Sequence, residues 1–190
     1  SGYTPVCINE WAEGLCDKRQ YKCADCPNRA FLPLNFEAVK AHLRGNDPLC
    51  RDVVAIYPMR EDNTTWLLAA DFDEANWQAN VAAFRKCCTV LGLTPAVERS
   101  RSGNGAHVWL FFSEPVSAAD ARRLGSGLLT RTMACRHELS FASYDRLFPT
   151  QDTVPKGGFG NLIALPFQGQ AQKTGNTLFV DEQLVPYPDQ

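Results

Sequence analysis

The sequence predicts an α+β fold, in which helices pack on a mostly antiparallel sheet, plus a small cysteine-rich module at the N-terminus. Segments with strand character come in neighbouring pairs separated by helical segments, unlike the strict alternation of a parallel α/β sheet. The chain has 190 residues and is 45% hydrophobic, which is enough for one substantial domain and a small appendage. Four of its eight cysteines fall within residues 7–26.

The N-terminal module is predicted to span residues 1–33 and to bind one structural zinc ion. Its four cysteines include a Cys-x-x-Cys pair and can complete a tetrahedral thiolate site: Cys7, Cys16, Cys23 and Cys26. The segment lacks the apolar periodicity for a core of its own, so a metal would have to hold it. A disulfide framework is the alternative. No signal peptide is visible, which favours zinc in a reducing cytoplasm.

The rest of the chain, residues 34–190, is predicted to be the core domain. Helices are expected at 36–43, 74–91 and 117–136, and the last opens with a Ser-x-x-Asp capping pattern. Strands are expected at 53–58, 65–71, 95–101 and 106–112, and further strand and loop at 141–145, 161–167 and 177–180. Cys88 and Cys135 fall on apolar helical stripes and are interpreted as core residues. No apolar run approaches the roughly 20 residues of a membrane span.

Two carboxylates stand at the end of the strand predicted over 65–71. Alternation places Asp71 and Asp73 on one face, with Phe72 on the other. Two such carboxylates repel each other unless a cation lies between them. Oxygen ligands of this kind suit Mg²⁺ or Mn²⁺, ions that also accompany transferred phosphates. The alternative is that Asp73 merely caps the following helix.

A glycine-rich turn with a histidine follows thirty-four residues later. Glycines in Ser102-Gly-Asn-Gly-Ala-His107 allow close approach of a ligand, and His107 can donate a hydrogen bond to a phosphate. Arg99, Arg101 and Ser102 lie just upstream, and alternation places the two arginines on one face. Arginine is suited to bidentate phosphate contacts. The alternatives are a plain hairpin turn and solvent-exposed arginines.

In this order, the motifs resemble the catalytic core of the archaeo-eukaryotic primase superfamily over about residues 50–180. The stretch from Glu98 to Trp109 looks closest to helicase-fused primase domains of mobile-element conflict systems, in which a Cys-rich segment also precedes the core. The resemblance implies an RNA-recognition-motif-like sheet and a third acidic metal ligand, for which Asp145 is preferred and Asp152 is the alternative. It also implies that His107 contacts the nucleotide phosphates, and it suggests Lys173 as a further phosphate contact.

The predicted activity is template-directed nucleotidyl transfer by a DNA primase or primase-polymerase that uses two divalent ions. Expected partners are a single-stranded DNA template and primer, nucleoside triphosphates, and a helicase domain in a longer parent chain. A metal-dependent nuclease and a non-catalytic zinc-bearing nucleic-acid-binding module are the alternatives. The glycine turn favours the first, because a nuclease needs no triphosphate cradle, and the intact Asp71 and Asp73 count against the last.

The charge distribution gives a weaker indication. A net charge of −2 argues against a purely electrostatic nucleic-acid binder. Residues 18–44, however, carry six Lys or Arg against two acids. This excess is interpreted either as a phosphate-facing patch or as an ordinary solvated face.

Overall fold

A five-stranded antiparallel sheet lies at the centre of the computed structural model, which describes residues 6–48, 52–73, 75–135, 146–154, 156, 158 and 160–190. The strand order is β5-β2-β4-β3-β7, and each neighbouring pair is antiparallel. The strands are β2 (Thr64–Phe72), β3 (Ala96–Arg99), β4 (Ala106–Ser117), β5 (Arg146–Phe148) and β7 (Phe179–Val180). The predicted α+β class with antiparallel pairing is confirmed.

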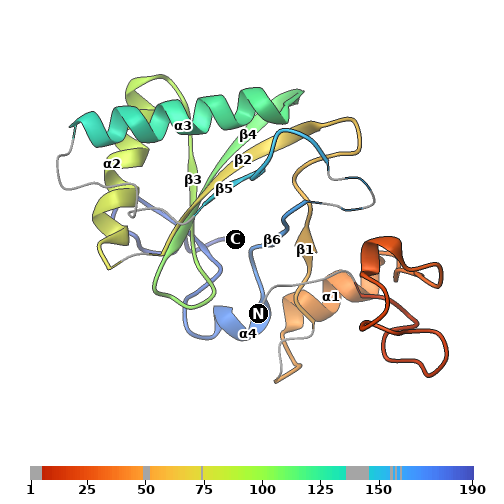
Figure 1. Ribbon diagram of the computed structural model, residues 1–190. Coiled ribbons are helices and arrows are strands. Elements are labelled where there is room, and N and C mark those ends of the chain that lie inside the picture. The colour runs from red at the N-terminus through yellow and green to blue at the C-terminus, as the bar shows by residue number, and fades with distance from the viewer. Residues whose placement is uncertain are drawn as a thin grey trace.

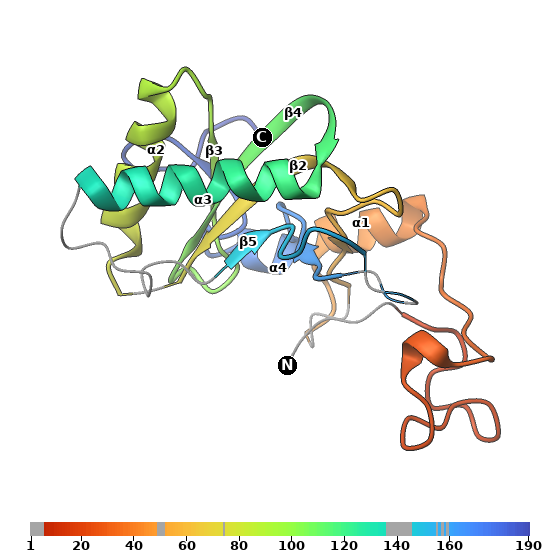
Figure 2. The same ribbon diagram turned by 45° about the horizontal axis from the view of Figure 1, so that its top comes forward.

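Two long helices, α2 (Trp77–Val90) and α3 (Ala118–Cys135), cover one face of this sheet (Figures 1 and 2). Alternate residues of β2 point to this face, and Phe72 packs edge-on against Phe84 of α2 at 5.5 Å between ring centroids. The capping pattern predicted before α3 is present, since the Ser117 hydroxyl accepts a hydrogen bond from the Asp120 N–H. The main hydrophobic core therefore lies between the sheet and the two helices.

The opposite face of the sheet carries a second, two-stranded sheet of β1 (Ala55–Ile56) and β6 (Ile163–Ala164). The strands predicted over 53–58 and 161–167 are thus shorter than expected and pair with each other. A smaller apolar cluster joins the two sheets: Leu67, Ala69, Trp109, Phe148 and Ile163. This layer leaves the ends of β2 and β4 open to a cavity.

Helix α1 (Phe36–Arg44) is fixed beside the second sheet and α4 (Gly169–Gln172). The buried His42 ring bridges the Pro166 carbonyl at 2.8 Å and the Val54 N–H at 3.0 Å. Gly45 caps α1 with a φ of 59° and lies so close to α4 that a Cβ there would lie 1.9 Å from the Gln170 nitrogen. Residues 6–32 form a loop-rich module beyond α1, with one 3₁₀ turn, Cys23–Asp25.

Most predicted boundaries of helices lie within a few residues of the observed ones. Helix α2 begins at Trp77 after Asn76, so Asp73 is not its N-cap. The segment 141–145, predicted as strand, lies outside the described residues. Of the helices in the described part of the chain, none is long and apolar enough to cross a membrane.

Candidate active site

A row of four polar side chains crosses the central sheet on the face opposite α2 and α3. The strand register pairs Asp71 of β2 with Arg146 of β5 on one side and with His107 of β4 on the other. His107 is in turn paired with Glu98 of β3. Directly paired residues of an antiparallel sheet point to the same face. The row therefore alternates a guanidinium, a carboxylate, an imidazole and a second carboxylate.

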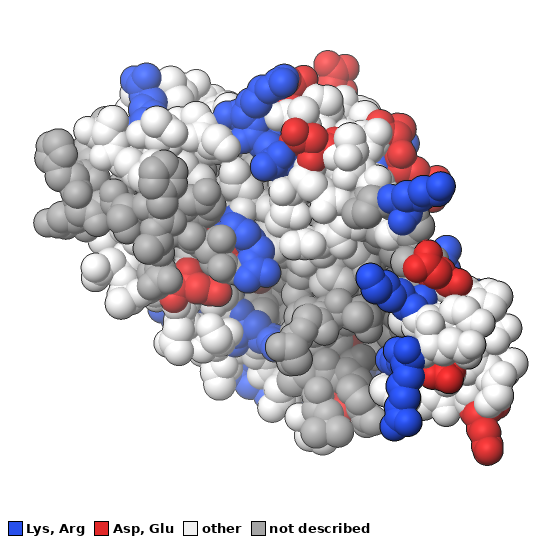
Figure 3. All heavy atoms as spheres, in the orientation of Figure 1, with Lys and Arg blue, Asp and Glu red and all other residues white. Residues whose placement is uncertain are grey.

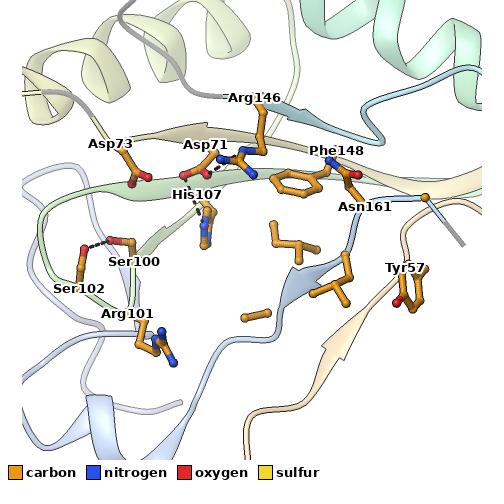
Figure 4. A pocket seen from close by; sticks show the side chains of 14 residues that line it. Tyr57, Asp71, Asp73, Ser100, Arg101, Ser102, His107, Arg146, Phe148 and Asn161 are labelled. Atoms are coloured by element: carbon orange, nitrogen blue, oxygen red, sulfur yellow. Dashed lines mark hydrogen bonds and ion pairs between the residues drawn. The ribbon is translucent and has the colours of Figure 1, made fainter. Parts of the chain in front are cut away.

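Three members of this row open into a cavity of about 500 Å³, a volume within the range of small-molecule sites (Figure 4). The central sheet and the turn before β4 form one wall, and Tyr57 with the segment around β6 forms the other. The lining residues are Tyr57, Asp71, Asp73, Ser100, Arg101, Ser102, His107, Arg146, Phe148, Gly160, Asn161, Leu162, Ile163 and Ala164. Polar groups thus gather at one end of the cavity and apolar groups at the other.

His107 lies between two carboxylates. Its Nδ1 is 3.0 Å from Glu98 Oε2, and its Nε2 is 3.5 Å from Asp71 Oδ1. Burial alone lowers the pKa of His107, but the hydrogen bond to Glu98 and the charges of Glu98, Asp71 and Asp73 outweigh burial, so its pKa is raised. The imidazole is therefore held in a form that can donate from both nitrogens.

The two aspartates predicted as metal ligands both line this cavity. Asp71 is 7% exposed, and its Oδ2 lies 3.9 Å from the Arg146 Nε. The Asp73 carboxylate leans over Gly105, where a Cβ would lie 2.4 Å from Oδ1. The fold therefore brings both carboxylates to the same end of the cavity as His107, and a glycine opposite β2 leaves the room for one of them.

The glycine-rich turn between β3 and β4 is closed by its own backbone. The Ser100 N–H donates to the Gly105 carbonyl at 2.9 Å, and Gly103 adopts a φ of 78° that favours glycine. The Ser102 hydroxyl accepts a bond from the Asn104 N–H at 3.2 Å. Ser102 and Arg101 both line the cavity. The turn therefore presents a hydroxyl and a guanidinium beside His107, as the sequence predicts.

The donor set at the end of β2 fits a divalent cation, because carboxylate oxygens are the ligands that Mg²⁺ and Mn²⁺ prefer. Asp71 and Asp73 supply them at one cavity end. Within the described residues, no three His, Cys, Asp or Glu side chains form a ready metal site. Asp145, the preferred third ligand, lies outside the described residues.

Three other predicted residues do not line this cavity. The Arg99 guanidinium lies over Trp77 of α2, 5.9 Å from the ring centroid, on the helix-covered side of the sheet. Lys173 bonds to Gln170 at the end of α4 and is exposed. Asp152 forms an ion pair with Arg122 of α3. The expectation that Arg99 and Arg101 share a face is wrong, because β3 ends at Arg99 and Arg101 lies in the turn.

The four N-terminal cysteines line one small cavity as free thiols: Cys7, Cys16, Cys23 and Cys26. Around them, large apolar side chains of the module remain exposed, including Val6 at 55%, Ile8 at 62% and Trp11 at 75%. The described part of the module therefore builds no substantial apolar core. The thiols converge as a zinc site requires, although they are not gathered into the ready metal site sought above.

The predicted basic patch is partly neutralised by neighbouring acids. Lys18 pairs with Glu10 at 2.5 Å, a hydrogen bond that raises the Lys18 pKa, and Lys40 lies 3.8 Å from Glu37. In Figure 3, Lys and Arg side chains lie on the side of the module nearest the core domain, with acidic side chains close by. The distribution of charge is therefore mixed rather than uniformly basic.

The sequence model of one protein family, described as the archaeo-eukaryotic primase domain of the TOTE conflict system, matches residues 1–190. The chain belongs to this family. The predicted superfamily is thereby confirmed, and membership supports a nucleotidyltransferase-type function for this primase-family domain. Among curated proteins, none matches the sequence.

One solved structure with similarity to the domain is the polymerase domain of Ligase D from Mycobacterium tuberculosis, in complex with DNA. The similarity covers 65% of this chain and 44% of that one, with 19% sequence identity and a TM-score of 0.40. This primase-family domain therefore spans less than half the length of that structure.

Two members of the polar row were missed by the sequence reasoning. Arg146 follows Asp145 directly, but only the β5–β2 register shows that it faces Asp71. Glu98 stands one residue before Arg99, and alternation along β3 and β4 was the available signal that it shares a face with His107. Tyr57 and Asn161 reach the cavity from loops beside the second sheet, which sequence periodicity does not indicate.

Proposed function

We propose that this domain is a template-directed nucleotidyltransferase, a primase or primase-polymerase. It would add nucleotides to a 3′-hydroxyl or start a primer on single-stranded DNA. The observation that carries the proposal is the meeting of Asp71, Asp73 and His107 at one end of a single cavity, beside a glycine turn. Membership of the primase family supports the same class of chemistry.

Asp71 and Asp73 would hold Mg²⁺ or Mn²⁺ together with a third carboxylate. When bound, such ions activate the attacking 3′-oxygen and hold the triphosphate and its leaving group. Asp145 remains the preferred third ligand, because the next residue, Arg146, pairs with Asp71. Asp152 is less suited, since it pairs with Arg122 on the helix-covered side of the molecule.

The side chains beside the aspartates would bind the triphosphate. His107 donates from Nε2 to a phosphate oxygen, and Arg101 and Ser102 offer a guanidinium and a hydroxyl from the turn. In the reaction, the 3′-oxygen forms a bond to the α-phosphorus, the bond to the leaving pyrophosphate breaks, and the hydroxyl proton leaves the 3′-oxygen. His107 and Arg101 stabilise the negative charge that the phosphates carry through this step.

The test is incubation of the domain with labelled nucleotides, Mn²⁺ and single-stranded template, with and without a primer. We expect extension in the wild type and its loss in Asp71→Asn and Asp73→Asn, with Asp189→Asn as a matched control on an exposed carboxylate. Degradation of the template would instead indicate a nuclease. Retention of template without either reaction would indicate a binding module.

His107 has a test of its own. His107→Ala should weaken nucleotide binding in calorimetry more than template binding, because its Nε2 faces the cavity end that holds Asp71. Equal nucleotide affinity in the wild type and a folded His107→Ala variant would contradict the proposed phosphate contact.

We further propose that the N-terminal module holds a structural zinc ion and contacts the single-stranded template. Arg19 and Lys22 stand on the module beside its cysteines, as exposed cations that can neutralise phosphates. Template affinity should then fall as salt rises, because phosphate contacts release counterions. The double variant Arg19→Ala, Lys22→Ala should flatten that dependence by about two contacts. An unchanged slope would leave the module a purely structural role.

A further inference from the structure

Glu98 is a buried carboxylate in the interior of the central sheet. It is 1% exposed, and its strand, β3, is paired with β4 on one side and with β7 on the other. Its Oε2 accepts two hydrogen bonds, from His107 Nδ1 at 3.0 Å and from the Trp109 indole Nε1 at 3.0 Å. Both donors come from β4 and lie two residues apart, so they share the face on which Glu98 stands.

A carboxylate at this position is difficult to explain by stability alone. Removing a charge from water is costly, and well-packed apolar residues often stabilise a core at least as well as buried ionic groups. The neighbours of Glu98 in the row, by contrast, belong to the candidate active site. Its second donor, Trp109, is buried and stacks parallel to Phe111 at 6.1 Å between ring centroids. Trp109 therefore holds the carboxylate from the apolar side.

We propose that Glu98 is a positioning residue that fixes the orientation of His107. The two ring nitrogens of an imidazole point in opposite directions, so a partner on one sets the direction of the other. With Nδ1 held by Glu98, Nε2 is aimed at the cavity and lies 3.5 Å from Asp71 Oδ1. Nε2 is the nitrogen that donates to the triphosphate, and this step of the argument rests on the proposed function.

The first test needs no nucleotide. In the ¹⁵N-labelled domain, the Nδ1 proton of His107 should give a downfield resonance in proton NMR, identified by its loss in His107→Gln. Glu98→Ala should abolish that resonance. Glu98→Gln should retain it, because the amide oxygen can accept the same bond. Trp109→Phe should also retain it, since this variant removes the other bond to Glu98 and leaves the ring in place. An unchanged His107 resonance in folded Glu98→Ala would overturn the proposal.

The second test measures nucleotide incorporation at saturating template. Loss of a group that orients a reacting residue typically costs about 10–100-fold, and we expect this loss in Glu98→Ala, mostly in the nucleotide KM, with rescue in Glu98→Gln. Equal losses in Glu98→Ala and Trp109→Phe, with the His107 resonance intact in both, would indicate packing alone and overturn the proposal. If the wild type binds no nucleotide, the proposed function fails, whereas the resonance still decides whether Glu98 orients His107.

Discussion

Gly105 lies directly against the carboxylate of Asp73, although the two residues stand on different strands' ends. A Cβ at Gly105 would lie 2.4 Å from Asp73 Oδ1 and 2.5 Å from the Phe72 carbonyl oxygen. The contact arises because Phe72, the last residue of β2, pairs with Ala106, the first of β4. The glycine of the turn therefore has a second role besides turning the chain, since it leaves room for a predicted metal ligand.

Gly105→Ala should therefore reduce nucleotide incorporation at least about 10-fold, because either the Asp73 carboxylate or the end of β2 must shift. The measurement is the incorporation rate as a function of Mn²⁺ concentration, where the variant should need more metal. Gly127→Ala in α3 is the control, since no atom lies within 4 Å of a Cβ there. It should keep full activity and gain up to about 1 kcal/mol of stability. Wild-type rates and metal dependence in a folded Gly105→Ala variant would contradict this account.

The third carboxylate can be assigned by comparing two substitutions. Asp145→Asn should lower incorporation at least about 100-fold, as expected for loss of a metal ligand. Asp152→Asn should leave the rate within a few-fold of wild type and cost less than about 1 kcal/mol, because its ion pair with Arg122 is solvent-exposed. Rates and thermal unfolding of the two variants decide between them. The reverse ranking would move the metal site toward Asp152.

Local signals predicted the helices and the positions of the two main motifs. The Ser117 cap and Gly92 mark helix ends within the sequence itself, and α3 and α2 begin and end within three residues of the predicted bounds. Alternation along β2 and β4 placed Asp71 and His107 at corresponding strand ends, where the structure pairs them. These features depend on neighbours in the sequence, which is why the sequence alone is informative there.

Long-range register was beyond the sequence. The pairing of β1 with β6 joins residues more than one hundred positions apart, and no local pattern specifies it. The same holds for Arg146, which reaches Asp71 through the β5–β2 register. Arg99 failed for a different reason: the period of two was extended past the end of β3, whereas the Ser100 N–H already bonds to Gly105 and closes the turn.

His42 should be essential for holding α1 against the core. It is 2% exposed and bridges the Pro166 carbonyl and the Val54 N–H. His42→Ala would leave both backbone groups buried without this partner, and each such loss costs about 1–3 kcal/mol. We expect a total of about 2–5 kcal/mol, measured by urea unfolding. Lys40→Ala, an exposed change on the same helix, should cost less than about 1 kcal/mol. Equal stabilities of the two variants would contradict the bridging role.

The N-terminal cysteines should bind about one zinc ion per chain, measured by elemental analysis of protein purified without added metal. The reason is that four thiols converge in a module whose apolar side chains remain largely exposed, so a metal must supply its stability. Cys23→Ser should lower the zinc content substantially. Cys88→Ala is the control and should retain zinc, because Cys88 is fully buried under α3 and α2 in the main core.

Thiol reactivity gives an independent measure of the same site. Burial, aided by the neighbouring Cys87, raises the pKa of Cys88 to about 12, so this thiol should resist alkylation at neutral pH while the core is folded. A zinc chelator should therefore expose Cys7, Cys16, Cys23 and Cys26 to the reagent and leave Cys88 protected. Mass spectrometry of the alkylated chain locates the modified residues. Full reactivity of the four N-terminal thiols before chelation, or a disulfide among them under reducing conditions, would exclude the zinc site.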